Sequence, residues 1–400
     1  MFEIFKDAIV GLANDSGFMN IGIKDIIMIL VSFVFMYLAI AKDFEPLLLL
    51  PISFGILLTN LPGAEMYHPE LFVIDEAGHI DVLNVLTNGG LLDLLYLGVK
   101  LQIYPPLIFL GIGCMTDFSP LIANPKSFLL GAAAQAGIFV TFIGAALLGM
   151  SPTECGAIAI IGGADGPTAI YVSSRLLKPT DTINTGTIAL AAYTYMALVP
   201  IIQPPVIKAL TTKNERRIRM DNSSIQVSKL TKILFPIIIT IVAGIVAPSS
   251  ASLIGFLMFG NLIRECGVLD SLSDTAQHVL ANLVTIFLGF TIANQMVAEK
   301  FLQPATLLIL GLGLFAFIFD TAGGVLFAKL LNVFLPKDKK LNPMIGAAGI
   351  SAFPMSGRVV HKLGLAEDNQ NFLLMHSIGV NVSGQIASVI AGGLILNFFM

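Results

Sequence analysis

An aspartate lies in the middle of a long apolar stretch of the chain. Asp165 belongs to the run IGGADGPT at 161–168, where three glycines and one proline accompany it. A carboxylate inside a membrane-length apolar segment costs a few kcal/mol or more unless it is paired or hydrated, so such residues usually mark ion or proton pathways. Because Pro167 has no N–H, the carbonyl of Gly163 loses its helical partner. The motif therefore predicts a Na⁺ site at Asp165 and Gly163, and a packing kink with a hydrogen-bonded acid is the alternative.

A second broken segment carries neutral oxygens in place of a charge. It reads NPMIGAAGISAFP at 342–354 and offers the Asn342 amide and the Ser351 hydroxyl. Its final proline has no N–H, so one more backbone carbonyl lacks a helical donor. Paired breaks at corresponding places in two halves of a chain are typical of transporter sites near the bilayer centre. We therefore expect Asn342 and Ser351 to bind Na⁺ together with Asp165. Taken singly, each could instead cap a helix or join two helices by a hydrogen bond.

Other polar side chains accompany these two motifs. Arg358 follows the second break and could bind a carboxylate through its planar guanidinium, although an arginine at the end of an apolar segment more often reaches toward the interface. Tyr195 has a hydroxyl that could bind a cation and pass a proton, and Asn381 is a polar residue within the last apolar run. Asp320 interrupts another apolar run and is a candidate second ion site.

The composition indicates which elements must position these groups. Hydrophobic residues make up 56% of the 400 residues and charged residues only 12%, too few to cover the surface of a soluble protein. The net charge of −4, without a basic stripe, excludes a nucleic-acid partner. Strand-like alternation is absent, which disfavours a barrel. The sequence therefore predicts an all-α polytopic membrane protein with about ten transmembrane helices embedded in lipid.

The chain divides into halves that resemble each other. The motif IFLG occurs at 108–111 and again at 286–289, and each copy precedes one of the broken segments. We place the basic linker between the halves on the cytoplasmic side, because Lys and Arg accumulate in cytoplasmic loops. We expect two inverted repeats with broken helices or hairpins. The predicted organisation is an N-terminal interfacial helix with the first spans and a polar loop at 1–90, a first repeat at 91–205, the linker at 206–232 and a second repeat at 233–400.

Several long motifs also resemble those of a known family. The chain is similar to the membrane β subunit of the biotin-dependent, sodium-pumping decarboxylases, which act on oxaloacetate, methylmalonyl-CoA, glutaconyl-CoA or malonate. The resemblance extends from about Leu91 to the C-terminus and is weak in the preceding residues. It rests on four segments: GGADGPTAIYVSSRLLKP, AAYTYMALVPIIQPP, NPMIGAAGISAFPMSGRVV and NFLLMHSIGVNVSGQIAS.

The resemblance implies a function and a set of partners. In that family a soluble carboxyltransferase α subunit moves CO₂ from the acid onto biotin, which a separate biotin carrier protein holds. The β subunit then decarboxylates carboxybiotin, exports Na⁺ and consumes a proton. The resemblance further implies an elevator-transporter-like fold, a small γ or δ membrane subunit, a homotrimer and a place in the bacterial inner membrane. Biotin would not be attached to this chain.

The resemblance also assigns roles to individual residues. Asp165 matches an essential intramembrane aspartate, and Tyr195 matches a tyrosine linked to coupling. Four residues around the second break match the family's second functional stretch, namely Asn342, Gly346, Ser351 and Arg358. Together with the motifs above, this gives catalysis by Asp165, Arg358 and Tyr195, and Na⁺ binding by Asp165, Gly163, Asn342, Gly346, Ser351 and Asn381.

Two other functions are compatible with the same motifs. A Na⁺-coupled secondary transporter of an organic anion, without enzymatic activity, would show the same broken repeats and the same aspartate. A purely structural membrane anchor for a soluble decarboxylase would tolerate substitution of Asp165 and Ser351. Release of CO₂ from carboxybiotin in a Na⁺-dependent manner distinguishes the decarboxylase from both.

Overall fold

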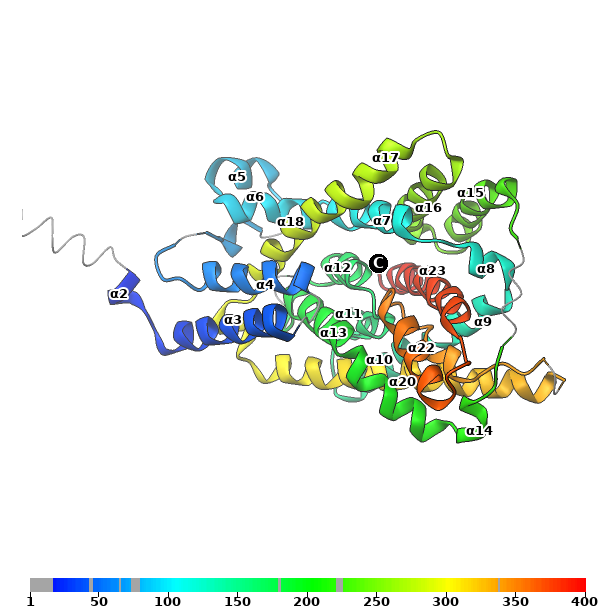
Figure 1. Cartoon of the computed structure of the whole chain (residues 1–400). Coiled ribbons are helices and arrows are strands. Elements are labelled where there is room, and N and C mark those ends of the chain that lie inside the picture. Colours follow the sequence, from blue (N-terminus) through cyan, green and yellow to red (C-terminus); the bar gives the residue numbers. More distant parts are fainter. Residues whose placement is uncertain are drawn as a thin grey trace, which may run out of the picture.

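The part of the chain that the structure describes is built from helices. The computed structural model describes residues 17–42, 46–64, 66–72, 80–178, 181–220, 226–336 and 339–400 (Figure 1). Within these residues seven helices are long and apolar enough to cross a membrane, or up to eight if a bent helix pair at 91–115 counts as one span. The all-α, polytopic architecture is therefore confirmed, whereas the predicted number of about ten spans exceeds the seven or eight found in the described residues, because several apolar segments form shorter helices. The predicted N-terminal interfacial helix falls largely outside the described residues.

The helices follow one another along the chain as labelled in Figure 1. Before the aspartate motif lie α2 (Gly17–Asn20), α3 (Ile23–Lys42), α4 (Pro46–Thr59), η1 (Pro69–Phe72), α5 (Val82–Asn88), α6 (Leu91–Lys100), α7 (Tyr104–Met115), α8 (Ser119–Ala123), α9 (Lys126–Ala133) and α10 (Ala136–Leu147). The motif and the linker region contain α11 (Pro152–Ala159), η2 (Ile160–Gly163), α12 (Gly166–Leu176), α13 (Thr185–Leu210) and α14 (Lys213–Arg216). The second half contains α15 (Lys229–Val246), η3 (Pro248–Ser250), α16 (Ala251–Cys266), α17 (Asp270–Asp274), η4 (Thr275–Leu280), α18 (Ala281–Ala293), α19 (Ala298–Phe301), α20 (Pro304–Phe334), α21 (Met344–Ala347), α22 (Met355–Glu367) and α23 (Leu374–Phe399).

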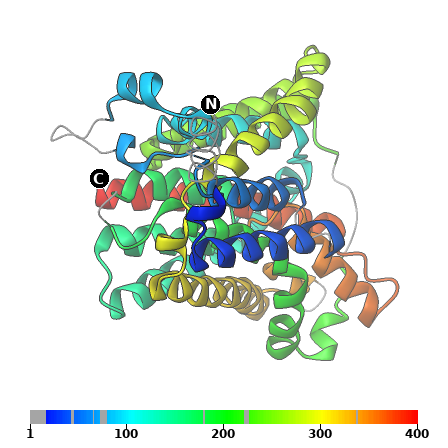
Figure 2. The same cartoon turned by 90° about the vertical axis from the view of Figure 1, so that its left-hand side faces the viewer.

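Two long helices form the centre of the bundle. In the most apolar stretches of α13 and α23, 61% of the residues are buried, against 17% in α3 and 11% in α15. Figure 2 shows α3 and α4 running across one side of the molecule, outside the central helices. An apolar helix with so little buried surface requires lipid or another membrane protein around it. The centre and the rim of the bundle therefore differ in what covers them, and the candidate site lies at the centre.

The aspartate motif lies at the tip of a helical hairpin. After α11 and η2 the chain reverses at Ala164, whose φ of 51° is left-handed, and α12 returns so that Gly156 lies against Leu176. At the base, the Glu154 carboxylate accepts hydrogen bonds from the backbone N–H and the hydroxyl of Thr182, at 3.1 and 2.6 Å. These bonds close the base of this first hairpin (residues 152–176) and hold its tip inside the bundle.

The second broken segment also forms a hairpin, which enters from the other end of the molecule. In this second hairpin (residues 344–367), α21 and α22 flank a non-helical tip. The amides of Asn342 and Asn371 both donate to the carbonyl of Arg216 at its base, at 2.9 and 2.8 Å. α13 starts beside the base of the first hairpin and ends at the linker that holds the second. Because its 26 residues span roughly 39 Å, the bases lie at opposite ends of the bundle.

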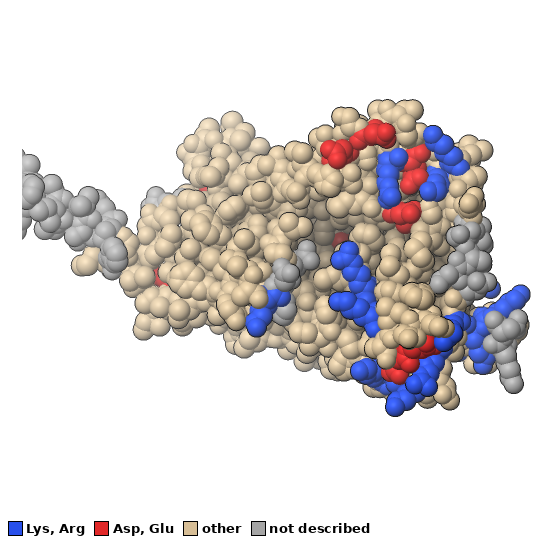
Figure 3. Space-filling view, viewed as in Figure 1, with Lys and Arg blue, Asp and Glu red and all other residues tan. Residues whose placement is uncertain are grey.

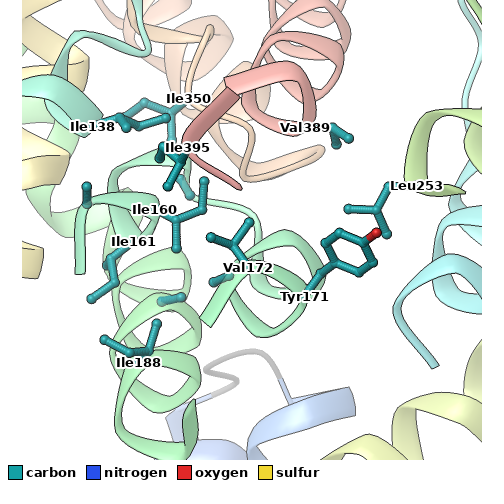
Figure 4. Close-up of a cluster of buried hydrophobic side chains, with 14 of the residues drawn as sticks. Ile138, Ile160, Ile161, Tyr171, Val172, Ile188, Leu253, Ile350, Val389 and Ile395 are labelled. Atoms are coloured by element: carbon teal, nitrogen blue, oxygen red, sulfur yellow. The ribbon is translucent and has the colours of Figure 1, made fainter. Parts of the chain in front are cut away.

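The core between the two tips consists of small and branched apolar side chains. Figure 4 shows Ile138 beside Ile350 of the second hairpin and Ile160 next to Val172, with Val389 of α23 on the side of Leu253; all belong to one core cluster. All six side chains are buried. Close-packed protein interiors respond to the loss or gain of a single methylene, so the packing around the two tips tolerates little change in side-chain volume.

The linker is tied to the base of the second hairpin by charged residues. The buried Arg216 side chain pairs with Glu367 at 2.7 Å and donates to the carbonyl of Thr211. The more exposed Arg219 forms a second pair with Asp368, also at 2.7 Å. Hydrogen bonds from Arg219 hold the pKa of Asp368 below its usual range, so this carboxylate is ionised at neutral pH. The described part of the linker up to residue 220 is thus an ordered strap, whereas its composition alone indicates a solvated connection.

Glu367→Gln should destabilise the protein more than the same type of change one residue later. The variant leaves the Arg216 guanidinium buried without an anion, which lowers the free energy of unfolding by roughly 3 kcal/mol. Asp368→Asn is the matched control, because its partner Arg219 is 56% exposed and such pairs contribute less than about 1 kcal/mol. Thermal unfolding of the detergent-solubilised chain measures both, and equal midpoints for the two variants would contradict this account of the strap.

Candidate functional site

The carboxylate of Asp165 is buried where the two hairpin tips meet. The residue is 6% exposed, and the Thr168 hydroxyl donates to its Oδ2 at 2.6 Å. Asp165 is the residue before α12, where the positive end of the helix dipole favours a negative group. No basic side chain of the described residues forms an ion pair with it. The carboxylate is therefore placed by neutral groups, namely hydroxyls and the backbone at the start of α12.

A serine of α23 connects the two hairpins. The hydroxyl oxygen of Ser388 lies 3.4 Å from Asp165 Oδ2 and 3.3 Å from the Ser351 hydroxyl, and 2.9 Å from the carbonyl of Gln385. A serine has only one hydroxyl hydrogen, so it cannot donate to all three acceptors. The Ser388 hydrogen can therefore satisfy only one of these three neighbouring oxygens at a time. We call the side-chain oxygens of Asp165, Thr168, Ser351 and Ser388 the oxygen cluster, and all four residues are buried.

The oxygen cluster has the chemistry of a site for a hard cation. One carboxylate and three hydroxyls supply only oxygen ligands, which suit Na⁺ or a proton and not a soft metal. Gly163 permits the close approach of α23, because a Cβ there would lie 3.3 Å from the Cβ of Ser388. Among the described residues there is also no group of three or more His, Cys, Asp or Glu side chains that could hold a metal ion. This arrangement brings the predicted residues Asp165, Gly163 and Ser351 together.

The predicted ligand Asn342 has its hydrogen bonds elsewhere. Its amide nitrogen donates to the carbonyls of Arg216 and Ile218, both at 2.9 Å, and its amide oxygen accepts from the N–H of Met344. No hydrogen bond joins Asn342 to Asp165 or Ser351. The reason is geometric, because α21 separates Asn342, at the hairpin base, from Ser351 at the tip. Asn342 positions the linker and the hairpin base.

Three amide side chains hold the tip of the second hairpin. Its non-helical backbone presents successive carbonyls that lack helical donors. Gln203 donates to Ala347, and Gln135 to Gly349, at 2.8 and 3.2 Å. Asn381 donates to the carbonyls of Ala348 and Ile350, at 3.0 and 2.6 Å. The carbonyl of Ile350, which was predicted to lack a helical donor, thus accepts a hydrogen bond from Asn381. Asn381 therefore fixes the tip that carries Ser351.

The two tyrosines of α13 have different surroundings. The Tyr195 hydroxyl donates to the carbonyl of Leu310 in α20, and its ring packs on Phe317. Tyr193 instead packs against Gly166, next to Asp165, so closely that a Cβ at Gly166 would overlap its ring. Of the two, Tyr193 is therefore in contact with the aspartate motif, and Tyr195 fastens α13 to α20.

Arg358 lies at a cavity on the linker side of the cluster. The cavity has a volume of about 490 Å³ and lies between α13 and α22. It is lined by Pro200, Pro204, Met355, Arg358, Val359, Lys362 and Leu363. Along α13, Pro200 is seven residues, or roughly 10 Å, beyond Tyr193 and the level of Asp165. Figure 3 shows basic side chains gathered around α14 and α22 at this end of the molecule. A cationic cavity thus opens on the linker side of the oxygen cluster.

Comparison with known proteins identifies the family. Residues 24–399 match the family described as the Na⁺-transporting oxaloacetate decarboxylase beta subunit. The methylmalonyl-CoA decarboxylase subunit beta of Propionigenium modestum is 52% identical over 98% of this chain and 99% of its own length. The oxaloacetate decarboxylase beta chain of Klebsiella pneumoniae is 46% identical, again over 98% of this chain and 99% of its own length.

The chain belongs to this family. It is a membrane subunit of a sodium-translocating decarboxylase and part of a multi-subunit enzyme, which confirms the function predicted from the motifs. The match starts well before Leu91, so the resemblance covers more of the chain than the motifs alone indicate. Relatives named for methylmalonyl-CoA and for oxaloacetate are both similar to this chain, so overall likeness does not select one acid.

Reasoning from the sequence of this β subunit missed Thr168 and Ser388. Thr168 stands three residues after Asp165 within the same motif, the spacing at which a side chain reaches back to a helix start. Ser388 follows Asn381 and Gln385 at intervals of four and three residues, so the three lie on one face of α23. This spacing of polar residues on one helix face is the sequence signal that could have identified Ser388. The candidate second ion site, Asp320, instead accepts a hydrogen bond from the N–H of Gly137 at the start of α10, at 2.6 Å, outside the oxygen cluster.

Proposed function

We propose that this chain decarboxylates carboxybiotin presented by a separate biotin carrier protein, and that it couples the release of CO₂ and the consumption of a proton to Na⁺ export. The observation that supports this most is the buried oxygen cluster between two hairpin tips, with a cationic cavity on its linker side. A membrane anchor needs neither a buried carboxylate nor such a cavity. The Na⁺-coupled anion transporter without enzymatic activity is set aside, because the family is one of decarboxylases.

The Na⁺ ligands in this proposal are side-chain oxygens from the four residues of the cluster. Asp165 supplies the negative charge, and Thr168, Ser351 and Ser388 supply hydroxyl oxygens. Gly163 permits the approach of α23. Asn342, Gly346 and Asn381 take positioning roles around the second hairpin in place of direct ligation.

The chemical step requires little from the protein besides a proton and a dry pocket. Carboxybiotin is an N-carboxylated urea, and it releases CO₂ when the N–C bond breaks and its electron pair is taken up by a proton on the ureido nitrogen. Arg358 at the cavity binds the carboxylate or the ring carbonyl. Na⁺ arriving from the linker side displaces the proton held at Asp165, and this proton is delivered toward the cavity. Tyr195 serves this step by holding α13, which forms one wall of the cavity.

The surroundings of the chain follow from the same proposal. The basic linker 206–232 faces the cytoplasm of a bacterium, and the chain lies in the inner membrane. A carboxyltransferase α subunit, the biotin carrier protein and a small γ or δ subunit complete the complex, and the β subunit forms a homotrimer. The opposite entry of the two hairpins supports two inverted repeats and an elevator-type movement.

Proteoliposomes containing the purified chain test the function. Free carboxybiotin is added on the linker side, and CO₂ release and ²²Na⁺ uptake are followed together. We expect CO₂ release that depends on Na⁺ and drives its movement. Transport without CO₂ release would favour the anion transporter, and CO₂ release independent of Na⁺ would contradict coupling.

Ser388→Ala should weaken the apparent affinity for Na⁺ about tenfold, because a ligand that interacts with a charged group is lost. The measurement is the Na⁺ concentration at half-maximal CO₂ release. Ser377→Ala is the matched control, since Ser377 is also buried on α23 and its hydroxyl has no hydrogen-bond partner among the described residues. An unchanged half-maximal concentration in Ser388→Ala would remove Ser388 from the ligand set.

A further inference from the structure

The cavity beside Arg358 contains a second cationic side chain. Lys362 lies four residues after Arg358 on α22, so both side chains project from the same face of the helix. Both line the cavity of about 490 Å³, and both are exposed to solvent. One cation would suffice to attract an anionic ligand, so the presence of a second requires an explanation.

The two cavity cations differ from other basic side chains at this end of the molecule. Arg216, Arg219 and Lys329 each form an ion pair with a described residue. Arg358 and Lys362 form none with the described residues. Two positive charges without a partner, one helical turn apart, repel each other and are stabilised when an anion binds between them.

The rest of the cavity wall is apolar. α22 turns a continuous face toward the cavity, on which Met355, Val359 and Leu363 alternate with the two cations, and Pro200 and Pro204 of α13 form the opposite side. Pro204 has no N–H to donate to the carbonyl of Pro200, so this carbonyl lacks its helical partner. The cavity thus combines two cations with an apolar wall, and Pro200, one of its lining residues, has a carbonyl without a helical donor. This set suits an organic monoanion with an apolar body.

We propose that Lys362 determines specificity in this cavity by binding the carboxylate of carrier-bound carboxybiotin together with Arg358, so that the carboxylated form binds more tightly than the neutral product. This inference rests on the proposed function. The planar guanidinium of Arg358 can engage two oxygens at once, whereas the ammonium of Lys362 acts as a point charge. When CO₂ leaves, the ligand loses its negative charge and the contribution of Lys362 is lost. Lys362 therefore favours exchange of biotin for the next carboxybiotin.

The full chain in detergent tests this assignment with carboxybiotin and biotin as probes, both supplied as side-chain amides, because the free acids carry a second carboxylate that is not lost with CO₂. The variants are Lys362→Gln and Lys362→Arg, and the matched control is Lys208→Gln, since Lys208 is exposed near the end of α13 but does not line the cavity. We expect Lys362→Gln to raise KM for carboxybiotin about tenfold, while kcat and the inhibition constant of biotin change less than about twofold. Lys362→Arg should restore KM, and Lys208→Gln should behave as the unmodified chain.

Three outcomes would overturn the assignment in distinguishable ways. An unchanged KM in Lys362→Gln removes Lys362 from substrate binding. An equal rise in KM for carboxybiotin and in the inhibition constant of biotin means that the cavity has changed shape and that the charge is not recognised. If the unmodified chain releases no CO₂ from carboxybiotin, the proposed function fails and this inference fails with it.

Discussion

Asp165→Asn is expected to reduce Na⁺-dependent CO₂ release about a hundredfold or more. The asparagine has the same size, and its amide oxygen can still accept the hydrogen bond from Thr168. What it removes is the only negative charge in the oxygen cluster. Neutral hydroxyls alone cannot offset the dehydration of Na⁺ in a site with little water, and a hundredfold loss corresponds to about 2.7 kcal/mol of cation binding. The measurement is the rate of CO₂ release from carboxybiotin with and without Na⁺.

Asp274→Asn is the matched control for this variant. Asp274 lies at the end of α17 with its side chain 71% exposed, and its ion pair among the described residues is an exposed one with His278. The same chemical change there should leave the rate and its Na⁺ dependence within about twofold, because exposed ion pairs contribute little. Full Na⁺ dependence in Asp165→Asn would show that the cation binds elsewhere.

Gly346→Ala is expected to disrupt the second hairpin. Gly346 in α21 and Gly324 in α20 touch through their backbones, and a Cβ on either residue would overlap the carbonyl oxygen of the other. Because the obstacle is backbone, the two helices must separate, at a cost of about 3 kcal/mol. Separation moves α21 and the tip that carries Ser351, so thermal stability and Na⁺-dependent CO₂ release should both fall.

Gly311→Ala is the control on α20. Nothing lies within 4 Å of a Cβ built at Gly311, so the methyl group enters open space. The substitution should be neutral or stabilise the helix by up to about 1 kcal/mol. If Gly346→Ala matched Gly311→Ala in thermal midpoint and in activity, the close approach of α20 and α21 would not be required.

The helical membrane fold and the position of the aspartate could be predicted from the sequence. A long apolar run with a carboxylate, glycines and a proline has few structural solutions, and Asp165 is indeed buried at a helix break. Its proximity to Ser351 was also predicted, since both belong to paired breaks. These features depend on local composition and on the likeness of the two broken segments in the sequence.

The remaining parts of the site depend on contacts between distant segments. Ser388 joins the cluster because α23 passes between the tips, and one serine in an apolar run looks like another in the sequence. Asn342 was expected at the cation site, but its partners are linker residues 124 and 126 positions away. Such contacts depend on tertiary packing between distant segments, and a local sequence pattern does not predict them.

Direct binding of ²²Na⁺ to the purified chain tests the central claim most simply, because it needs neither carboxybiotin nor partner subunits. We predict saturable binding to the unmodified chain, weaker binding to Ser388→Ala and none detectable with Asp165→Asn. Binding to Asp165→Asn with the affinity of the unmodified chain would contradict the assignment of Na⁺ to the oxygen cluster between the hairpin tips.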